Sequence, residues 1–116
     1  SLNKSSSLET RSRLILDSVT KQNQTNVASA WSNYQSNKSL LNSVQAQVRA
    51  AEIANEGIAA EYNSGAGRTT LEVIQSNSLL LNAQISLANS ERNYILSQFN
   101  LLKSIGLLHS EYLKIN

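Results

Sequence analysis

The sequence predicts an all-α fold: one long antiparallel helical hairpin of the coiled-coil type. The 116 residues contain 0 prolines and 4 glycines, although a globular chain with several turns uses many of both. The only dense turn signal is Asn63-Ser64-Gly65-Ala66-Gly67,. Apolar residues repeat every seven positions on both sides of that turn, and this is the repeat of a coiled coil.

The predicted elements form a single helical hairpin over 1–116. They are a helix over about 8–63, a turn over 63–69, a helix over about 70–106 and a short tail over 107–116. Thr69 or Thr70 can cap the second helix, and Glu72 then lies in its first turn, where a carboxylate is favoured. Gly106 is expected to end the second helix.

The first helix carries two heptad seams. One contains large residues, and we call it the large-residue seam: Val27, Tyr34, Leu41, Val48, Asn55 and Tyr62 with Ala30, Asn37, Val44, Ala51 and Ile58. The other is the small-residue seam: Ser29, Ser36, Ser43, Ala50, Gly57 and Ser64 with Ser32, Ser39, Ala46, Ile53 and Ala60.

The second helix also carries two seams. The apolar seam consists of Leu71, Ser78, Ile85, Arg92 and Phe99 with Ile74, Leu81, Ala88, Ile95 and Leu102. The alternating seam sets large residues against small ones: Val73, Leu80, Leu87, Tyr94, Leu101 and Leu108 with Ser76, Ala83, Ser90, Ser97 and Ser104.

Two seams on one helix require a neighbour on each side. At about 103° per residue, the two seams lie about 150° apart around each helix. Two helices cannot cover four seams, so we expect the hairpin to associate with further copies or with another part of a longer chain. A four-helix bundle with additional apolar residues on its surface is the alternative.

Composition excludes several classes of function. The net charge is only +2 and there are 0 cysteines and 1 histidine, so we expect no nucleic-acid stripe, disulfide, metal site or cofactor. No catalytic constellation is present, and we predict that the chain is not an enzyme. No apolar run reaches the ~20 residues of a membrane-spanning helix. Because the chain has 0 Met, we expect it to be a piece of a longer protein.

The residues around the turn resemble a family motif. The stretch from Glu61 to Ile74, with Arg68-Thr69 at its centre, is similar to the Y-x-x-G-x-R-T-x-x-D-V-L motif of TolC-type outer-membrane channel proteins. The similarity continues along the second helix to Leu108. This turn is one residue longer than the family spacing, so its backbone is expected to differ locally.

The resemblance implies a fold and a function. Family members form trimers whose membrane β-barrel continues into a periplasmic α-barrel, and this chain resembles the long helical pair of the second repeat. It is thereby expected to form staves of the tunnel wall in an efflux or type I secretion channel of the outer membrane. The implied partners are two further copies in a homotrimer, a periplasmic adaptor (membrane-fusion) protein and an inner-membrane pump. The isolated piece is expected to self-associate.

The resemblance also assigns roles at the turn. Tyr62 and Arg68 correspond to latch residues of the periplasmic gate, Glu72 to an acidic ring, and Gln75 to a second acidic position that is uncharged here. Simpler roles are seam packing for Tyr62, a solvated turn residue for Arg68 and a helix-dipole partner for Glu72.

The turn residues Gly65, Ala66, Gly67 and Thr69 correspond to the tip that docks the adaptor, although simple turn geometry also explains the glycines. The alternative function is a structural or adaptor coiled-coil hairpin, such as that of a periplasmic membrane-fusion protein.

Overall fold

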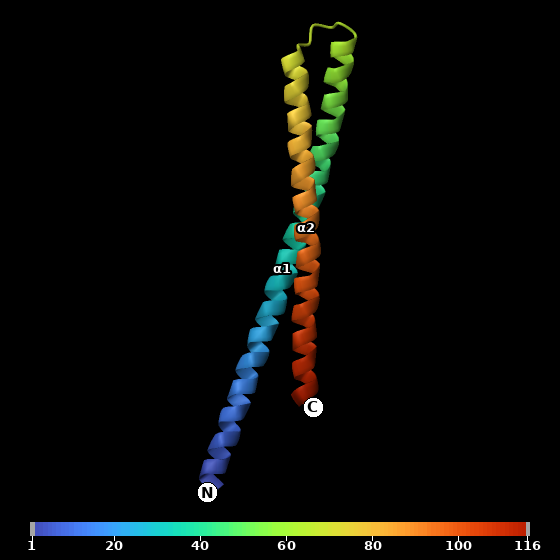
Figure 1. Ribbon diagram of the computed structural model, residues 1–116. Helices are drawn as coiled ribbons and strands as arrows, with labels where there is room; N and C mark the ends of the chain where they lie inside the picture. The colour runs from blue at the N-terminus through green and yellow to red at the C-terminus, as the bar shows by residue number, and fades with distance from the viewer. Residues whose placement is uncertain (1, 116) are drawn as a thin grey trace. The chain divides into compact units, whose positions relative to one another are not determined.

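This computed structural model describes residues 2–115 as two α-helices joined by a turn (Figure 1). Helix α1 spans Leu2–Asn63 and helix α2 spans Thr70–Ile115. No strand occurs among these residues. The prediction of an all-α helical hairpin is therefore confirmed.

Both helices extend beyond their predicted bounds. Helix α1 begins at Leu2 instead of near residue 8. Helix α2 continues through Gly106 to Ile115, so the predicted helix end at Gly106 and the predicted tail over 107–115 are wrong, and residue 116 lies outside the described residues. Gly106 lacks the positive φ that ends a helix,. Leu108 beyond it is half-buried, so packing continues past the glycine.

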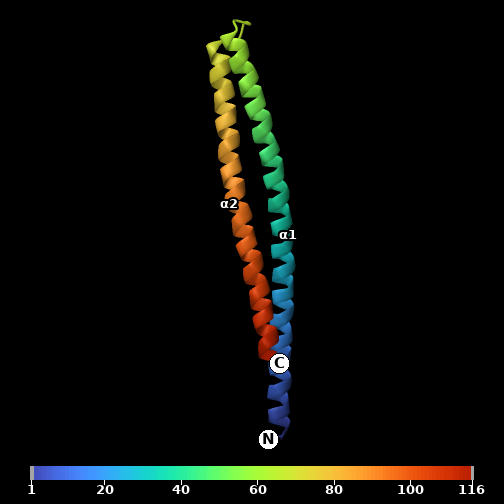
Figure 2. The ribbon, with the colours of Figure 1, turned by 90° about the vertical axis from the view of Figure 1, so that its right-hand side faces the viewer.

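The chain divides into two compact units. The terminal unit comprises Ser1–Tyr34 and Ser97–Asn116, and the tip unit comprises Gln35–Leu96. In the tip unit the two helices lie side by side and antiparallel below the turn, in green for α1 and yellow to orange for α2 (Figures 1 and 2).

The C-terminal end of α1 is closed by glycine. The amide of Gly65 donates to the carbonyl of Tyr62 at 3.3 Å, and the amide of Ala66 donates to the carbonyl of Glu61 at 2.9 Å. Gly65 has a φ of 75°. This pair of bonds around a left-handed residue is the Schellman motif, which satisfies carbonyls that the helix end would leave unpaired.

The N-terminal end of α2 is a capping box. The Thr69 hydroxyl accepts a hydrogen bond from the Glu72 amide at 3.2 Å, and the Glu72 carboxylate accepts one from the Thr69 amide at 3.1 Å. Of the two caps that the sequence allowed, Thr69 is therefore the one used. The reciprocal bonds satisfy two amides that have no partner inside the helix.

The two helices pair through one seam each. In the tip unit, the buried and most of the half-buried residues of α1 lie along the large-residue seam, and those of α2 lie along the alternating seam. The half-buried residues outside these seams are Gln45, Ala59 and Glu72. Val44 and Val48 are buried on α1, and Ser76 and Ser90 on α2. Small residues on α2 thus face large residues on α1, which lets the helices approach closely.

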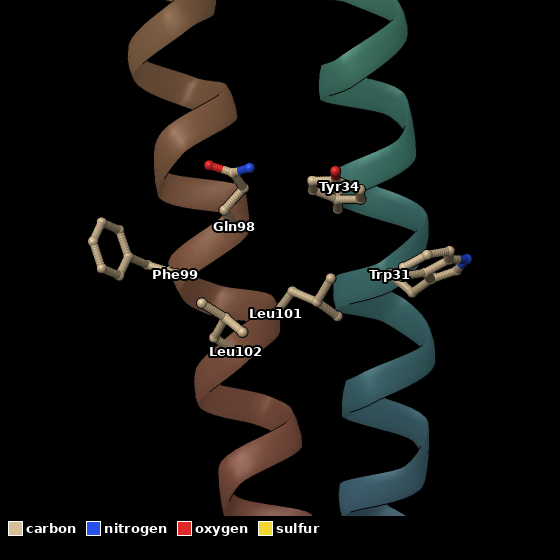
Figure 3. Close-up of a pocket in the computed structure, with 6 residues that line it drawn as sticks. All are labelled: Trp31, Tyr34, Gln98, Phe99, Leu101 and Leu102. Carbon is tan, nitrogen blue, oxygen red and sulfur yellow. The ribbon is translucent and has the colours of Figure 1, made fainter.

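The terminal unit uses the same two seams. Leu101, of the alternating seam, is buried and points toward α1, whereas Phe99, of the apolar seam, points away from it (Figure 3). Phe99 is 65% exposed. The rings of Trp31 and Tyr34 lie 5.7 Å apart on α1. Together with Phe99 and Leu101 they help to line a groove of about 400 Å³.

Replacing Gly65 by Ala tests the helix end. Because Gly65 has a φ of 75° and open space around its Cα, a methyl group meets no neighbour and only the backbone conformation is penalised. Unfolding by urea at fixed chain concentration, followed by circular dichroism, should show a loss of about 1–2 kcal/mol.

Gly106→Ala is the matched control. This glycine lies inside α2 with open space around it, so alanine should stabilise the helix by about 0.5–1 kcal/mol. Equal effects of the two substitutions would contradict the assigned backbone geometry.

A second prediction concerns the small residues that face α1. Ser90 is buried and Ser86, on the same helix, is exposed. Leucine at position 90 overfills the space between the helices and should destabilise the pair by about 1–3 kcal/mol. Leucine at position 86 should change the free energy of unfolding by less than about 0.5 kcal/mol, and a larger loss there would argue against this pairing of seams.

Candidate functional site

The turn places Arg68 between two carboxylates. Its Nε donates to Oε2 of Glu61 at 2.5 Å, and its Nη1 lies 3.7 Å from Oε2 of Glu72. The three side chains are 40–48% exposed, and exposed ion pairs stabilise a protein by only about 0–1 kcal/mol. The cluster therefore orients the Arg68 side chain but contributes little to the stability of the fold.

The charge of Arg68 is secure. Its hydrogen bond to Glu61 and the attraction of that carboxylate, with a smaller contribution from Glu72, raise the pKa of the guanidinium above its ordinary value. A guanidinium is protonated at physiological pH in any case. Arg68 can thus act as a donor fork and a fixed positive charge.

Glu61 is the partner that sequence reasoning missed. It lies in the last turn of α1, seven residues before Arg68 and on the other side of the turn. The available signal was a carboxylate just before a glycine-rich turn with an arginine just after it. This pattern predicts an ion pair only when the conformation of the turn is known. Gly65 and Gly67, both with positive φ, bring the two side chains together.

Tyr62 and Glu72 both make contacts across or within the turn. The Tyr62 hydroxyl lies 3.2 Å from Oγ1 of Thr70 in a hydrogen bond, and its ring is 42% exposed. Glu72 accepts from the Thr69 amide and also approaches Arg68. The simpler role considered for Glu72, a carboxylate at a helix N-terminus, is thus realised, and its charge remains partly exposed.

Gln75 lies beside this cluster, in a groove of about 310 Å³. Both apolar and polar side chains line the groove: Ala51, Ala54, Ile58, Arg68, Glu72, Gln75, Ser76 and Leu79. The structure therefore brings Arg68, Glu72 and Gln75 together on one side of the tip unit.

The proposed docking residues lie at the very end of the tip unit. Gly65, Ala66, Gly67 and Thr69 are all exposed. The Ala66 amide is used by the helix end, and the Thr69 hydroxyl by the capping box. This leaves a compact surface whose backbone is held by hydrogen bonds within the chain.

Neither a metal-binding group nor a membrane span is found among the described residues. Over residues 2–115, no three His, Cys, Asp or Glu side chains are grouped so that they could hold a metal ion. Within the same residues, neither helix has a stretch that is long and apolar enough to cross a membrane.

Two characterised proteins are similar to this chain. The outer membrane protein TolC of Escherichia coli is 29% identical over 85 residues, which are 73% of this chain and 17% of TolC. The outer membrane efflux protein BepC of Brucella suis is 26% identical over 103 residues, which are 89% of this chain and 22% of BepC. The chain thus spans about a fifth of the length of these relatives.

Neither a protein-family model nor a solved structure matches this chain. The two relatives are both outer membrane proteins, and one is named for efflux. Together with the helical hairpin and the motif at its turn, they confirm that the chain resembles one segment of the TolC-type outer membrane efflux proteins.

Proposed function

We propose that this chain forms part of the α-helical wall of a trimeric, TolC-like outer-membrane channel for efflux or type I secretion. The observation that carries the proposal is the pair of seams left uncovered. In the apolar seam of α2, Leu71, Ile85 and Phe99 are 62%, 51% and 65% exposed. The small-residue seam of α1 is exposed as well.

These two exposed seams complement each other in size. In the wall, the large side chains on α2 pack against small residues of a neighbouring helical pair, and the small residues of α1 receive large side chains from the pair on the other side, much as the alternating seam fits α1 within the chain. Such a contact between different surfaces repeats from one helical pair to the next, and it closes into a ring when the rotation between neighbouring pairs completes a circle, as the proposed trimer requires. A ring of helices encloses a passage, as a tunnel wall requires.

The proposed location is supported by the two relatives. Both are outer membrane proteins, and this chain contributes a helical segment that we place in the periplasm. The segment acts passively in this proposal: it builds the wall, while an inner-membrane pump linked through a periplasmic adaptor supplies the energy. The exposed tip, with Gly65, Ala66, Gly67 and Thr69, is the adaptor-docking surface.

The gate is assigned to the residues beside the tip. Tyr62 and Arg68 act as latch residues, and Glu72 and Gln75 line the constriction. Because Arg68 is already paired with Glu61 and Glu72 of its own chain, a bond to a neighbouring copy shares or replaces those pairs. One carboxylate at Glu72, beside an uncharged Gln75, predicts a modest preference for cations.

Assembly is tested at the small-residue seam. Ser43 lies in this seam and Asn42 beside it, and both are exposed. Ser43→Leu should abolish the trimer of the full channel, measured by light scattering after size-exclusion chromatography, because a bulky side chain blocks the approach of the neighbouring helical pair. Asn42→Leu should leave the trimer intact, and trimers of equal yield from both variants would contradict the proposed packing.

The gate is tested by Glu72→Gln. Glutamine keeps the oxygen that accepts from the Thr69 amide and so preserves the capping box, but it removes the charge. Reversal potentials of the full channel in a salt gradient should therefore show a loss of cation preference. The loss of the charge at the helix N-terminus and of the exposed ion pair should lower the free energy of unfolding by no more than about 1 kcal/mol.

Thr69→Ala is the control for Glu72→Gln, because it removes the helix cap without changing any charge. It should cost about 1 kcal/mol of stability and leave ion selectivity as it was. If the Glu72→Gln channel keeps its cation selectivity, the assignment of Glu72 to the constriction is contradicted.

A further inference from the structure

The tip unit has two polar faces of different chemistry. On each helix the two seams occupy opposite flanks, so the remaining heptad positions fall on the two faces between them. The groove that brings Ala54 of α1 beside Gln75 and Leu79 of α2 shows which positions share a face.

The face that contains this groove we call the amide face. Repeating the positions of Ala54, Gln75 and Leu79 by sevens gives its members: Leu40, Gln47, Ala54 and Glu61 on α1, and Glu72, Gln75, Leu79, Asn82, Ser86, Asn89, Asn93 and Leu96 on α2. All but Glu72, which is half-buried, are exposed.

The opposite face we call the charged face. Its members are Gln35, Lys38, Asn42, Gln45, Arg49, Glu52, Glu56 and Ala59 on α1, and Asn77, Gln84 and Glu91 on α2. Its charged residues, such as Arg49, Glu52 and Glu91, are exposed.

Charge is therefore segregated within residues 35–96. Glu61, Arg68 and Glu72 form the cluster at the turn, and Arg92 lies in the apolar seam. The other charged residues all lie on the charged face. Away from the turn, the amide face presents only amides, serine and apolar side chains.

We infer that the amide face lines the passage and that the charged face points to the outside. This rests on the proposed function: Glu72 and Gln75, assigned there to the constriction, are the first members of the amide face. A wall of amides offers both donors and acceptors and adds no fixed charge. The shaft then admits hydrated solutes of either sign, and discrimination by charge is confined to the turn.

The chain has 0 cysteines, so single cysteines report on each face. Asn89→Cys lies on the amide face and Gln84→Cys on the charged face, both exposed on α2. They are placed in the full channel, in a background without other cysteines, and single channels are exposed to a thiol reagent that carries a sulfonate.

With Asn89→Cys, the current should fall in steps, one for each copy that reacts, and the remaining current should become more cation-selective. With Gln84→Cys, mass spectrometry should show modification while the current stays unchanged.

The outcomes separate the inference from the proposed function. If only Gln84→Cys affects the current, or if neither labelled variant does, the assignment of faces is overturned and the channel itself stands. If the cysteine-free channel forms no conducting pore, the proposed function fails and the inference fails with it.

Discussion

A helix can bury only one stripe of its surface against a single partner, and the turn decides which stripe that is. Between the glycine-closed end of α1 and the capping box of α2, the chain reverses so that the large-residue seam meets the alternating seam. Inside this contact the Ser76 hydroxyl donates to Oδ1 of Asn55 at 2.9 Å. A part-buried polar pair of this kind favours one register over its neighbours. Everything that remains exposed, including both outer seams and both polar faces, follows from that register.

The turn concentrates structural and functional demands on the same residues. Glu72 accepts a hydrogen bond from the helix cap and approaches Arg68, and in the proposed gate it also supplies the charge of the constriction. Glu61 draws Arg68 back toward its own chain. The two helix ends are thus satisfied by Gly65, Thr69 and Glu72 within the chain, and no neighbour is needed to cap them.

The sequence was sufficient for the helices, the turn and the four seams, because those depend on local rules: absent proline, clustered glycine and a heptad repeat. It was not sufficient for the choice among seams. Either seam of α1 could face either seam of α2, and only the turn geometry selects the pair. The predicted helix end at Gly106 was wrong for a related reason. A glycine ends a helix only where its backbone is left-handed, and at Gly106 the helix continues so that Leu108 can pack. Glu61 was missed because its partner is seven residues away across the turn.

The small size of the inner contact explains why the outer seams matter. Val44, Val48 and Leu101 are the apolar side chains that are buried in the part of the chain whose side chains are described, and burying each contributes about 1.5–3 kcal/mol. Most large apolar residues of α2 remain exposed. The inner contact is therefore small for helices of this length. In the proposed wall, neighbouring helices cover the outer seams and leave both polar faces open.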